Sequence, residues 1–155
     1  MKKGFTLVEL LITITIVTVV VASGVSAYGR ARDRQILQAS VEKLISTLQG
    51  TQKQALIGDK DSSCVDNLLG YQTTFSANTL TTQARCSGGN SSAVNTAFTS
   101  ITFTSPFPTI TFRPLGQGVI FGTGGSVDTI DFSYQGRSYS VEVDESGNIQ
   151  YLGEQ

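Results

Sequence analysis

The most constraining feature of this chain is an apolar segment close to its N-terminus that contains a single acidic residue. Residues 7–22 are almost all aliphatic, and the only interruptions are Glu9 and three threonines. Extended to residues 5–25, the stretch is about 21 residues long, which is enough to cross a bilayer as an α-helix. A carboxylate inside a membrane costs roughly 2.5–3.5 kcal/mol, so it needs a partner there. We therefore expect a membrane-anchored chain in which Glu9 has a function.

A secretory signal peptide is the alternative interpretation of this segment. Residues 21–27, Val-Ala-Ser-Gly-Val-Ser-Ala, imitate a small-residue cleavage site. A signal peptide has a shorter apolar region, however, and no reason to carry Glu9. The sequence favours a segment that is retained.

The first nine residues, Met-Lys-Lys-Gly-Phe-Thr-Leu-Val-Glu, closely resemble the processing and assembly signal of type IV pilins and pseudopilins. The resemblance implies that a prepilin peptidase cleaves after Gly4, removes the leader 1–4 and leaves a new terminus at Phe5, which is then N-methylated. It also implies that Glu9 pairs with the terminal ammonium group of a neighbouring subunit during assembly. Such a pair neutralises two charges that are each costly in a bilayer. Phe5 and Glu9 are the expected assembly residues.

Helical periodicity continues beyond the apolar segment, with polar residues between the apolar ones. The expected buried stripe is Leu37, Val41, Leu44, Leu48 and Ala55, widened by Ile45 and Leu56. Gly58 is a reasonable C-terminal stop. The expected organisation is the leader 1–4, a transmembrane and assembly helix over 5–25, an amphipathic helix over 26–58 and a β-rich extracytoplasmic domain over 59–155.

After residue 59 the chain is rich in Ser, Thr, Gly and Asn, and short apolar–polar alternations predict β-strands. The expected strands are 71–75, 79–85, 100–104, 109–113, 118–121, 129–134, 138–143 and 148–152. The last three form an antiparallel meander that turns at Gln135-Gly136 and again at residues 144–147. Residues 87–92 are expected to form a mobile loop. The predicted fold class is α+β, a long N-terminal helix packed on an antiparallel sheet domain, which is the pilin fold.

The chain contains two cysteines, Cys64 and Cys86. In an exported domain they would form one disulfide bond that closes a loop of about 22 residues and is worth roughly 3 kcal/mol. Two free thiols in a reducing compartment are the alternative. The membrane segment argues for export and therefore for the disulfide.

The sequence gives little reason to expect a metal or a cofactor. The chain has no histidine, and two isolated cysteines do not make a zinc site. Asp128 with Asp131, or Asp144 with Glu145 and Asn148, are conceivable calcium ligands, but Asp, Gly and Asn favour turns for conformational reasons. We expect no metal site and no cofactor.

Charge and composition also argue against nucleic-acid binding and against catalysis. The net charge of the chain is −1, and residues 61–155 hold three arginines against eight acidic residues. Such a surface repels nucleic acid, whose affinity for proteins comes largely from phosphate neutralisation. A serine nucleophile would have no histidine to activate it, so we do not expect an enzyme.

The resemblance implies a structural subunit, a minor pilin or pseudopilin, of a type IV pilus-like or type II secretion fibre. Such a subunit sits in the bacterial inner membrane as a single-pass protein, with its N-terminus in the cytoplasm and its C-terminal domain outside. Its expected partners are other pilin or pseudopilin subunits, the prepilin peptidase and methyltransferase, the inner-membrane assembly platform and membrane lipid. Residues 110–116, 130–134 and 138–149 are similar to the β-domain of GspH/FimT-like minor pseudopilins. A minor subunit is also favoured by residues 24–28, Gly-Val-Ser-Ala-Tyr, which lack the proline that major pilins usually carry in this neighbourhood.

Two other functions remain open. One is a DNA-receptor minor pilin that serves natural transformation, which would need basic residues clustered on the exposed domain. The other is a single-pass protein with an extracytoplasmic binding domain that never polymerises. Replacement of Glu9 would leave the second of these intact but would stop a fibre subunit from being incorporated.

Overall fold

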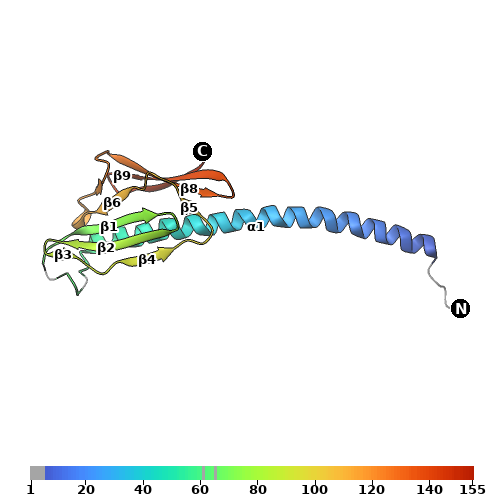
Figure 1. The fold of residues 1–155 in the computed structure, drawn as a ribbon, viewed down its shortest axis with the longest axis horizontal. Helices are drawn as coiled ribbons and strands as arrows, with labels where there is room; N and C mark the ends of the chain where they lie inside the picture. Colours follow the sequence, from blue (N-terminus) through green and yellow to red (C-terminus); the bar gives the residue numbers. More distant parts are fainter. Residues whose placement is uncertain (1–5, 61, 65) are drawn as a thin grey trace. The chain divides into compact units, whose positions relative to one another are not determined.

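The structure, a computed structural model, describes residues 6–60, 62–64 and 66–155. Its longest element is helix α1, Leu7–Ile57, and β-strands dominate the described chain after it (Figure 1). The chain divides into two compact units, Met1–Gln38 and Ala39–Gln155, and helix α1 contributes to both. The organisation predicted above, with a boundary between residues 25 and 26, stays a prediction.

The strands are short, and a single turn of 3-10 helix, η1, lies between two of them. Their bounds are β1 Leu68–Ser76, β2 Thr79–Cys86, β3 Gly89–Asn90, β4 Val94–Ala97, β5 Thr102–Phe103, β6 Thr109–Phe112, η1 Pro114–Gly116, β7 Val119–Phe121, β8 Val127–Tyr134, β9 Arg137–Asp144 and β10 Ile149–Glu154.

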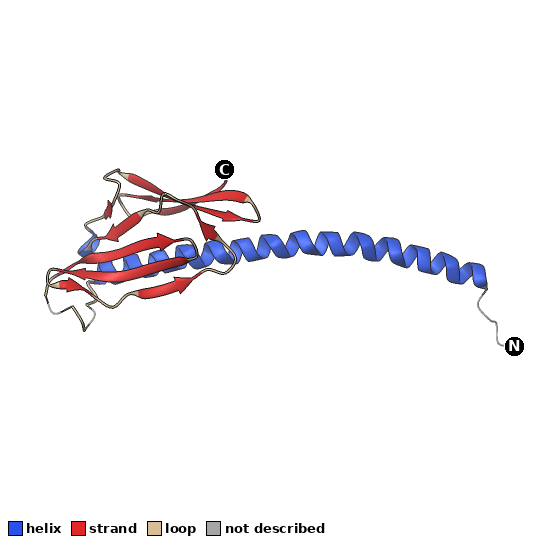
Figure 2. Ribbon diagram, in the orientation of Figure 1, coloured by secondary structure: helices blue, strands red, loops and turns tan. Residues whose placement is uncertain are grey.

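The strands form two antiparallel sheets, drawn in red in Figure 2. The first sheet has the order β3-β2-β1-β6-β7, and β4 also pairs with β2; the second has the order β10-β9-β8-β5. Strands β8, β9 and β10 are neighbours in the chain and in the sheet, which confirms the predicted meander. The predicted α+β fold, a long helix with an antiparallel β-sheet domain, is therefore confirmed.

Within the unit Ala39–Gln155, helix α1 buries one apolar stripe. Val41, Leu44, Leu48 and Ala55 are at most 6% exposed, as predicted, and Thr51 at 3% completes the row. The prediction was wrong for Leu56, which is 52% exposed. Leu56 follows Ala55 directly and is therefore rotated by about 100° around the helix, away from the stripe.

Two polar side chains of the helix reach distant parts of the same unit. The Gln52 Nε2 amide donates to the backbone carbonyl of Gly147, in the turn before β10, at 3.0 Å. The Lys43 Nζ donates to the carbonyl of Ala97, at the end of β4, at 2.7 Å, and lies 4.8 Å from the centre of the Phe98 ring. These bonds supplement the apolar packing, because each satisfies a backbone carbonyl outside the ladders.

An aromatic cluster fills the core between the strands. The Phe103 ring packs edge-on against Phe75, Phe98 and Phe132, and the Phe132 ring stacks on Tyr139 at 5.9 Å. Such arrangements are the favoured geometries of aromatic pairs.

The helix ends where the sequence predicted a stop. Gly58 has φ +66°, its N–H donates to the Ala55 carbonyl, and the Asp59 N–H donates to the Gln54 carbonyl. These two bonds form a Schellman motif, in which glycine adopts the left-handed conformation without steric cost.

We expect Gly58→Ala to lower the free energy of unfolding by about 1 kcal/mol, because alanine is strained at a positive φ. Gly50→Ala is the matched control: Gly50 lies inside the helix, and a Cβ there meets nothing within 4 Å. It should raise stability by roughly 0.5–1 kcal/mol. Urea unfolding followed by circular dichroism measures both, and two changes of the same sign would contradict the prediction.

The predicted mobile loop at residues 87–92 is wrong in part, because it contains strand β3 and continues the sheet. The Ser91 N–H donates to the Ala84 carbonyl, and the Ala84 N–H donates to the Ser91 Oγ, both at 2.8 Å. A side-chain oxygen thus takes the place of a strand carbonyl between β3 and β4. Apolar alternation cannot reveal such a pairing, because backbone groups and one hydroxyl make it.

Candidate assembly site

Helix α1 begins with a side-chain cap that the sequence analysis missed. The Thr6 Oγ1 accepts a hydrogen bond from the Glu9 N–H at 3.3 Å, and the Thr6 carbonyl accepts from the Leu10 N–H at 3.2 Å. Thr6 is therefore the N-cap, and Glu9 lies in the first turn, where the helix dipole favours an acidic side chain. The spacing Thr-x-x-Glu is the sequence signal of a capping box and would have found this cap.

The three threonines of the apolar segment bond within the helix. The Thr13 hydroxyl donates to the Leu10 carbonyl at 2.9 Å, and the Thr15 hydroxyl donates to the Ile12 carbonyl at 2.8 Å. The Thr18 hydroxyl lies within hydrogen-bonding distance of the Ile14 and Thr15 carbonyls. These hydroxyl protons need no partner from outside, so the threonines are compatible with apolar surroundings.

The apolar side chains of this segment lie exposed on all sides of the helix. The exposed large residues are Leu7, Val8, Leu10, Leu11, Ile12, Ile14, Ile16, Val17, Val19, Val20 and Val21, between 53% and 77% accessible. Monomeric soluble proteins rarely expose a contiguous apolar surface of this kind. A helix that is apolar all round is normally buried, so this segment requires an apolar partner.

Glu9 is the only Asp, Glu, Lys or Arg residue between residues 4 and 29 of the sequence. Its side chain is exposed on the helix, and it forms no ion pair with any residue that the structure describes. The carboxylate is thus available to a partner of opposite charge. The predicted processing residues Gly4 and Phe5 lie outside the described residues, and their roles stay predictions.

The sequence predicts a membrane-crossing helix over residues 5–25. Among the helical residues that the structure describes, none of the stretches combines the length and the hydropathy that a membrane span needs.

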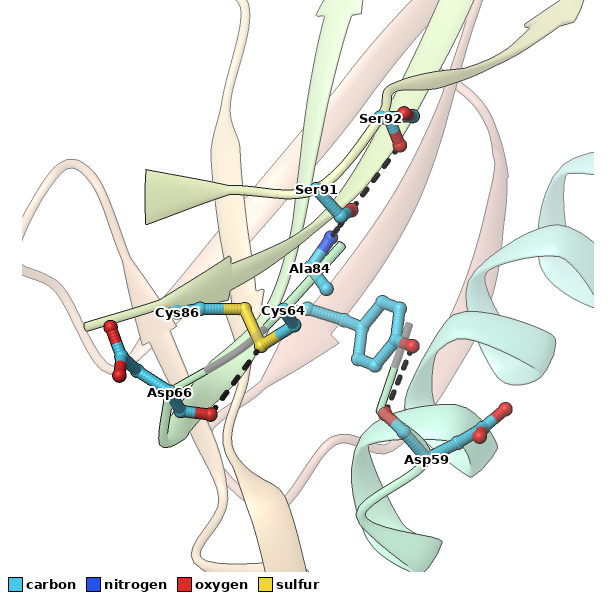
Figure 3. Close-up of a disulfide and its surroundings, with 8 residues drawn as sticks. Asp59, Cys64, Asp66, Ala84, Cys86, Ser91 and Ser92 are labelled. Atoms are coloured by element: carbon cyan, nitrogen blue, oxygen red, sulfur yellow. Dashed lines mark hydrogen bonds between the residues drawn. A yellow bond between two sulfur atoms is a disulfide. The ribbon is translucent and has the colours of Figure 1, made fainter. Parts of the chain in front are cut away.

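The C-terminal unit contains the predicted disulfide bond, which joins Cys64 to Cys86 (Figure 3). Cys64 lies between α1 and β1, and Cys86 is the last residue of β2; both are buried. The Tyr71 hydroxyl donates to the Asp59 carbonyl at 3.0 Å and fixes the same connection. The disulfide therefore ties the segment that leaves the helix to the first sheet.

The carboxylates considered as calcium ligands make hydrogen bonds within turns and strands. Asp128 accepts from the Thr129 N–H, and Asp131 accepts from the Ser140 hydroxyl at 2.7 Å. Asp144 accepts from the Ser146 hydroxyl at 2.6 Å and from the Asn148 N–H at 2.9 Å. No group of three or more possible metal ligands occurs in residues 6–60, 62–64 and 66–155.

The bonds to Asp144 predict an acid-sensitive turn. The Ser146 hydroxyl, followed by the Asn148 N–H, lowers the pKa of Asp144 below its ordinary value of 3.8. A lowered folded-state pKa gives stability that is present above the unfolded-state pKa and is lost as the pH falls through the folded-state pKa. We expect the turn to weaken below about pH 4. Asp144→Asn should flatten this part of the stability–pH profile, and an unchanged profile would contradict the prediction.

Residues 1–25 match the family described as the prokaryotic N-terminal methylation motif. No curated protein and no solved structure shows a significant match to the chain. The motif indicates a pilin-like subunit that a prepilin peptidase processes and that assembles with other pilin subunits, a structural role rather than an enzymatic one. It also suggests anchoring in a membrane. The chain carries the N-terminal motif of type IV pilins and pseudopilins, and this motif, with the α+β fold, supports placing it in that family.

Proposed function

We propose that this protein is a minor subunit of a type IV pilus-like or type II secretion fibre. It is stored in the bacterial inner membrane with its N-terminus in the cytoplasm, cleaved after Gly4 and methylated at Phe5. An inner-membrane assembly platform then brings it into a bundle of N-terminal helices. In the bundle, Glu9 pairs with the terminal ammonium group of a neighbouring subunit.

The observation that carries this proposal is the exposed apolar surface of the N-terminal segment of helix α1, residues 7–21, with one carboxylate on it. Packing this surface against lipid or against similar helices removes it from water, at about 25 cal/mol per Å² of apolar area. The internally bonded threonines suit either environment. Apolar packing alone does not define the axial register between two helices. A single carboxylate does, because a cation has to lie beside it.

The GspH/FimT-like subtype is a finer part of the proposal. It is supported by the antiparallel meander β8-β9-β10 and by the turn η1 after β6, which follow the segments named above. Among the described residues, the unit that would lie outside the membrane keeps few basic side chains, so we do not extend the proposal to DNA uptake.

The test uses the full-length precursor, expressed with its own prepilin peptidase and assembly system. Glu9→Gln keeps the size and removes the charge of the side chain. We expect normal processing, with a mature chain that begins at Phe5 by mass spectrometry. We also expect that its incorporation into sheared fibres falls by at least tenfold.

Glu42→Gln is the matched control, since Glu42 is an exposed acid on the same helix but outside the apolar segment. It should assemble like the wild type. A mature chain that begins at another residue would refute the processing step. Normal assembly of the Glu9→Gln chain would refute the assembly role of Glu9. Absence of the wild-type chain from the fibres would instead favour a single-pass protein that does not polymerise.

A further inference from the structure

We infer that Thr13 is a second acceptor for the ammonium group that binds Glu9, so that it helps to set the position of the incoming subunit. The inference rests on the function proposed above. It concerns a residue for which the motif match, covering residues 1–25 as a whole, gives no separate role.

Thr13 lies beside Glu9 on the helix surface. The two residues are four positions apart, so their side chains are neighbours on one face. The Thr13 hydroxyl donates its proton to the Leu10 carbonyl, at 2.9 Å, and this leaves its oxygen free to accept. Glu9 and Thr13 therefore present two acceptors side by side on an otherwise apolar face.

The other polar side chains of the segment are placed differently. Thr15 is six residues from Glu9, about one and two-thirds turns, so it points to another side of the helix. Thr6 is near Glu9, but its oxygen already accepts the Glu9 N–H, which uses one of its two lone pairs, whereas both lone pairs of the Thr13 oxygen remain. Among the described side chains of the segment, Thr13 is consequently the neighbour of Glu9 with the most acceptor capacity left for a docking cation.

The number of acceptors suits the number of donors. A terminal amine that carries one methyl group retains two N–H donors when it is protonated. One N–H can bond to the Glu9 carboxylate and the other to the Thr13 oxygen. In apolar surroundings an N–H without a partner is costly, and the penalty is larger for a charged donor. Thr13 is thus expected to improve the binding of a methylated terminus beyond the charge pair alone.

The test compares Thr13→Val with Thr15→Val in the full-length precursor. Both exchanges replace a hydroxyl by a methyl group, and both hydroxyls make the same bond to a carbonyl three residues earlier. We expect Thr13→Val to reduce incorporation into fibres by about tenfold, and Thr15→Val to leave it within twofold. Equal incorporation of the two variants would overturn the inference.

Two further variants separate binding from a structural effect. Thr13→Ser restores the oxygen and should recover incorporation, whereas failure to recover would overturn the inference. In the Glu9→Gln background, Thr13→Val should have no added effect, because the ammonium no longer docks there; a full tenfold loss in that background would also overturn it. If Glu9→Gln alone assembles normally, the assembly role of Glu9 in the proposed function is refuted. If Glu9→Gln fails to assemble but Thr13→Val and Thr15→Val are incorporated equally, only the inference about Thr13 is refuted.

Discussion

Phe132→Ala is expected to lower the free energy of unfolding by about 3–5 kcal/mol, the usual cost of removing a buried aromatic ring. Phe132 is 0% exposed, and its ring contacts Phe103 on one strand and Tyr139 on another. The substitution leaves a cavity between β5, β8 and β9 that the sheet backbone cannot close. Since domains are stable by only about 5–15 kcal/mol, this is a large share of the total.

Phe107→Ala provides the matched control, because it removes the same ring from an exposed place. Phe107 lies between Pro106 and Pro108 and is 43% exposed. Its loss should cost less than about 1 kcal/mol. Denaturant unfolding of the two variants measures the difference, and similar midpoints would refute our description of the core.

Gly70→Ala is expected to destabilise the first sheet by more than about 3 kcal/mol, or to prevent folding, because of strain and collision together. Gly70 has φ +150° and lies at an irregularity in the pairing of β1 with β2. A Cβ there would lie 2.5 Å from the Phe112 carbonyl oxygen of β6. The obstacle is backbone in the neighbouring strand, so relief requires moving the sheet.

Gly89→Ala separates backbone strain from the collision with a neighbouring strand. Gly89 has a similar φ of +138°, but a Cβ there meets nothing within 4 Å. It should therefore show the conformational strain alone, of order 1–3 kcal/mol. Thermal unfolding followed by circular dichroism provides the comparison. An equal loss at both sites would show that the contact with Phe112 does not matter.

The sequence predicted those parts of the fold in which apolar residues recur with a clear period. The helix, its buried stripe at Val41, Leu44 and Leu48, and the meander from β8 to β10 follow from such patterns. The turn at Gln135-Gly136 was predictable from its glycine between two alternating segments. In the structure both residues adopt positive φ, +50° and +78°, as a tight hairpin turn requires. The disulfide could be predicted because only two cysteines are present.

The sequence did not predict what depends on backbone pairing over a distance. Strands β3 and β4 lie in a segment of small polar residues, where pairing with β2 decides the structure and periodicity is absent. The exposure of Leu56 was missed because the width of a stripe depends on what packs against it. The 38% exposure of Tyr151 likewise depends on pairing, because its strand, β10, has a neighbour on one side only.

The candidate site was predictable in its charge but not in its hydrogen bonds. Glu9 is conspicuous in the sequence as the lone acid in an aliphatic segment. The acceptor at Thr13 depends on the direction of its hydroxyl group, which only the folded helix defines. The sequence alone does not show whether the oxygen of a threonine in an aliphatic segment is free to accept a hydrogen bond.

The threonines that bond within helix α1 have a consequence for the transfer of this helix from lipid into a fibre. When the apolar segment passes from lipid to a bundle of similar helices, the hydroxyls of Thr13, Thr15 and Thr18 can keep their hydrogen bonds to helix carbonyls. The transfer therefore breaks none of these three hydrogen bonds. We expect the position of the helix along its neighbours to be set by Glu9 together with Thr13.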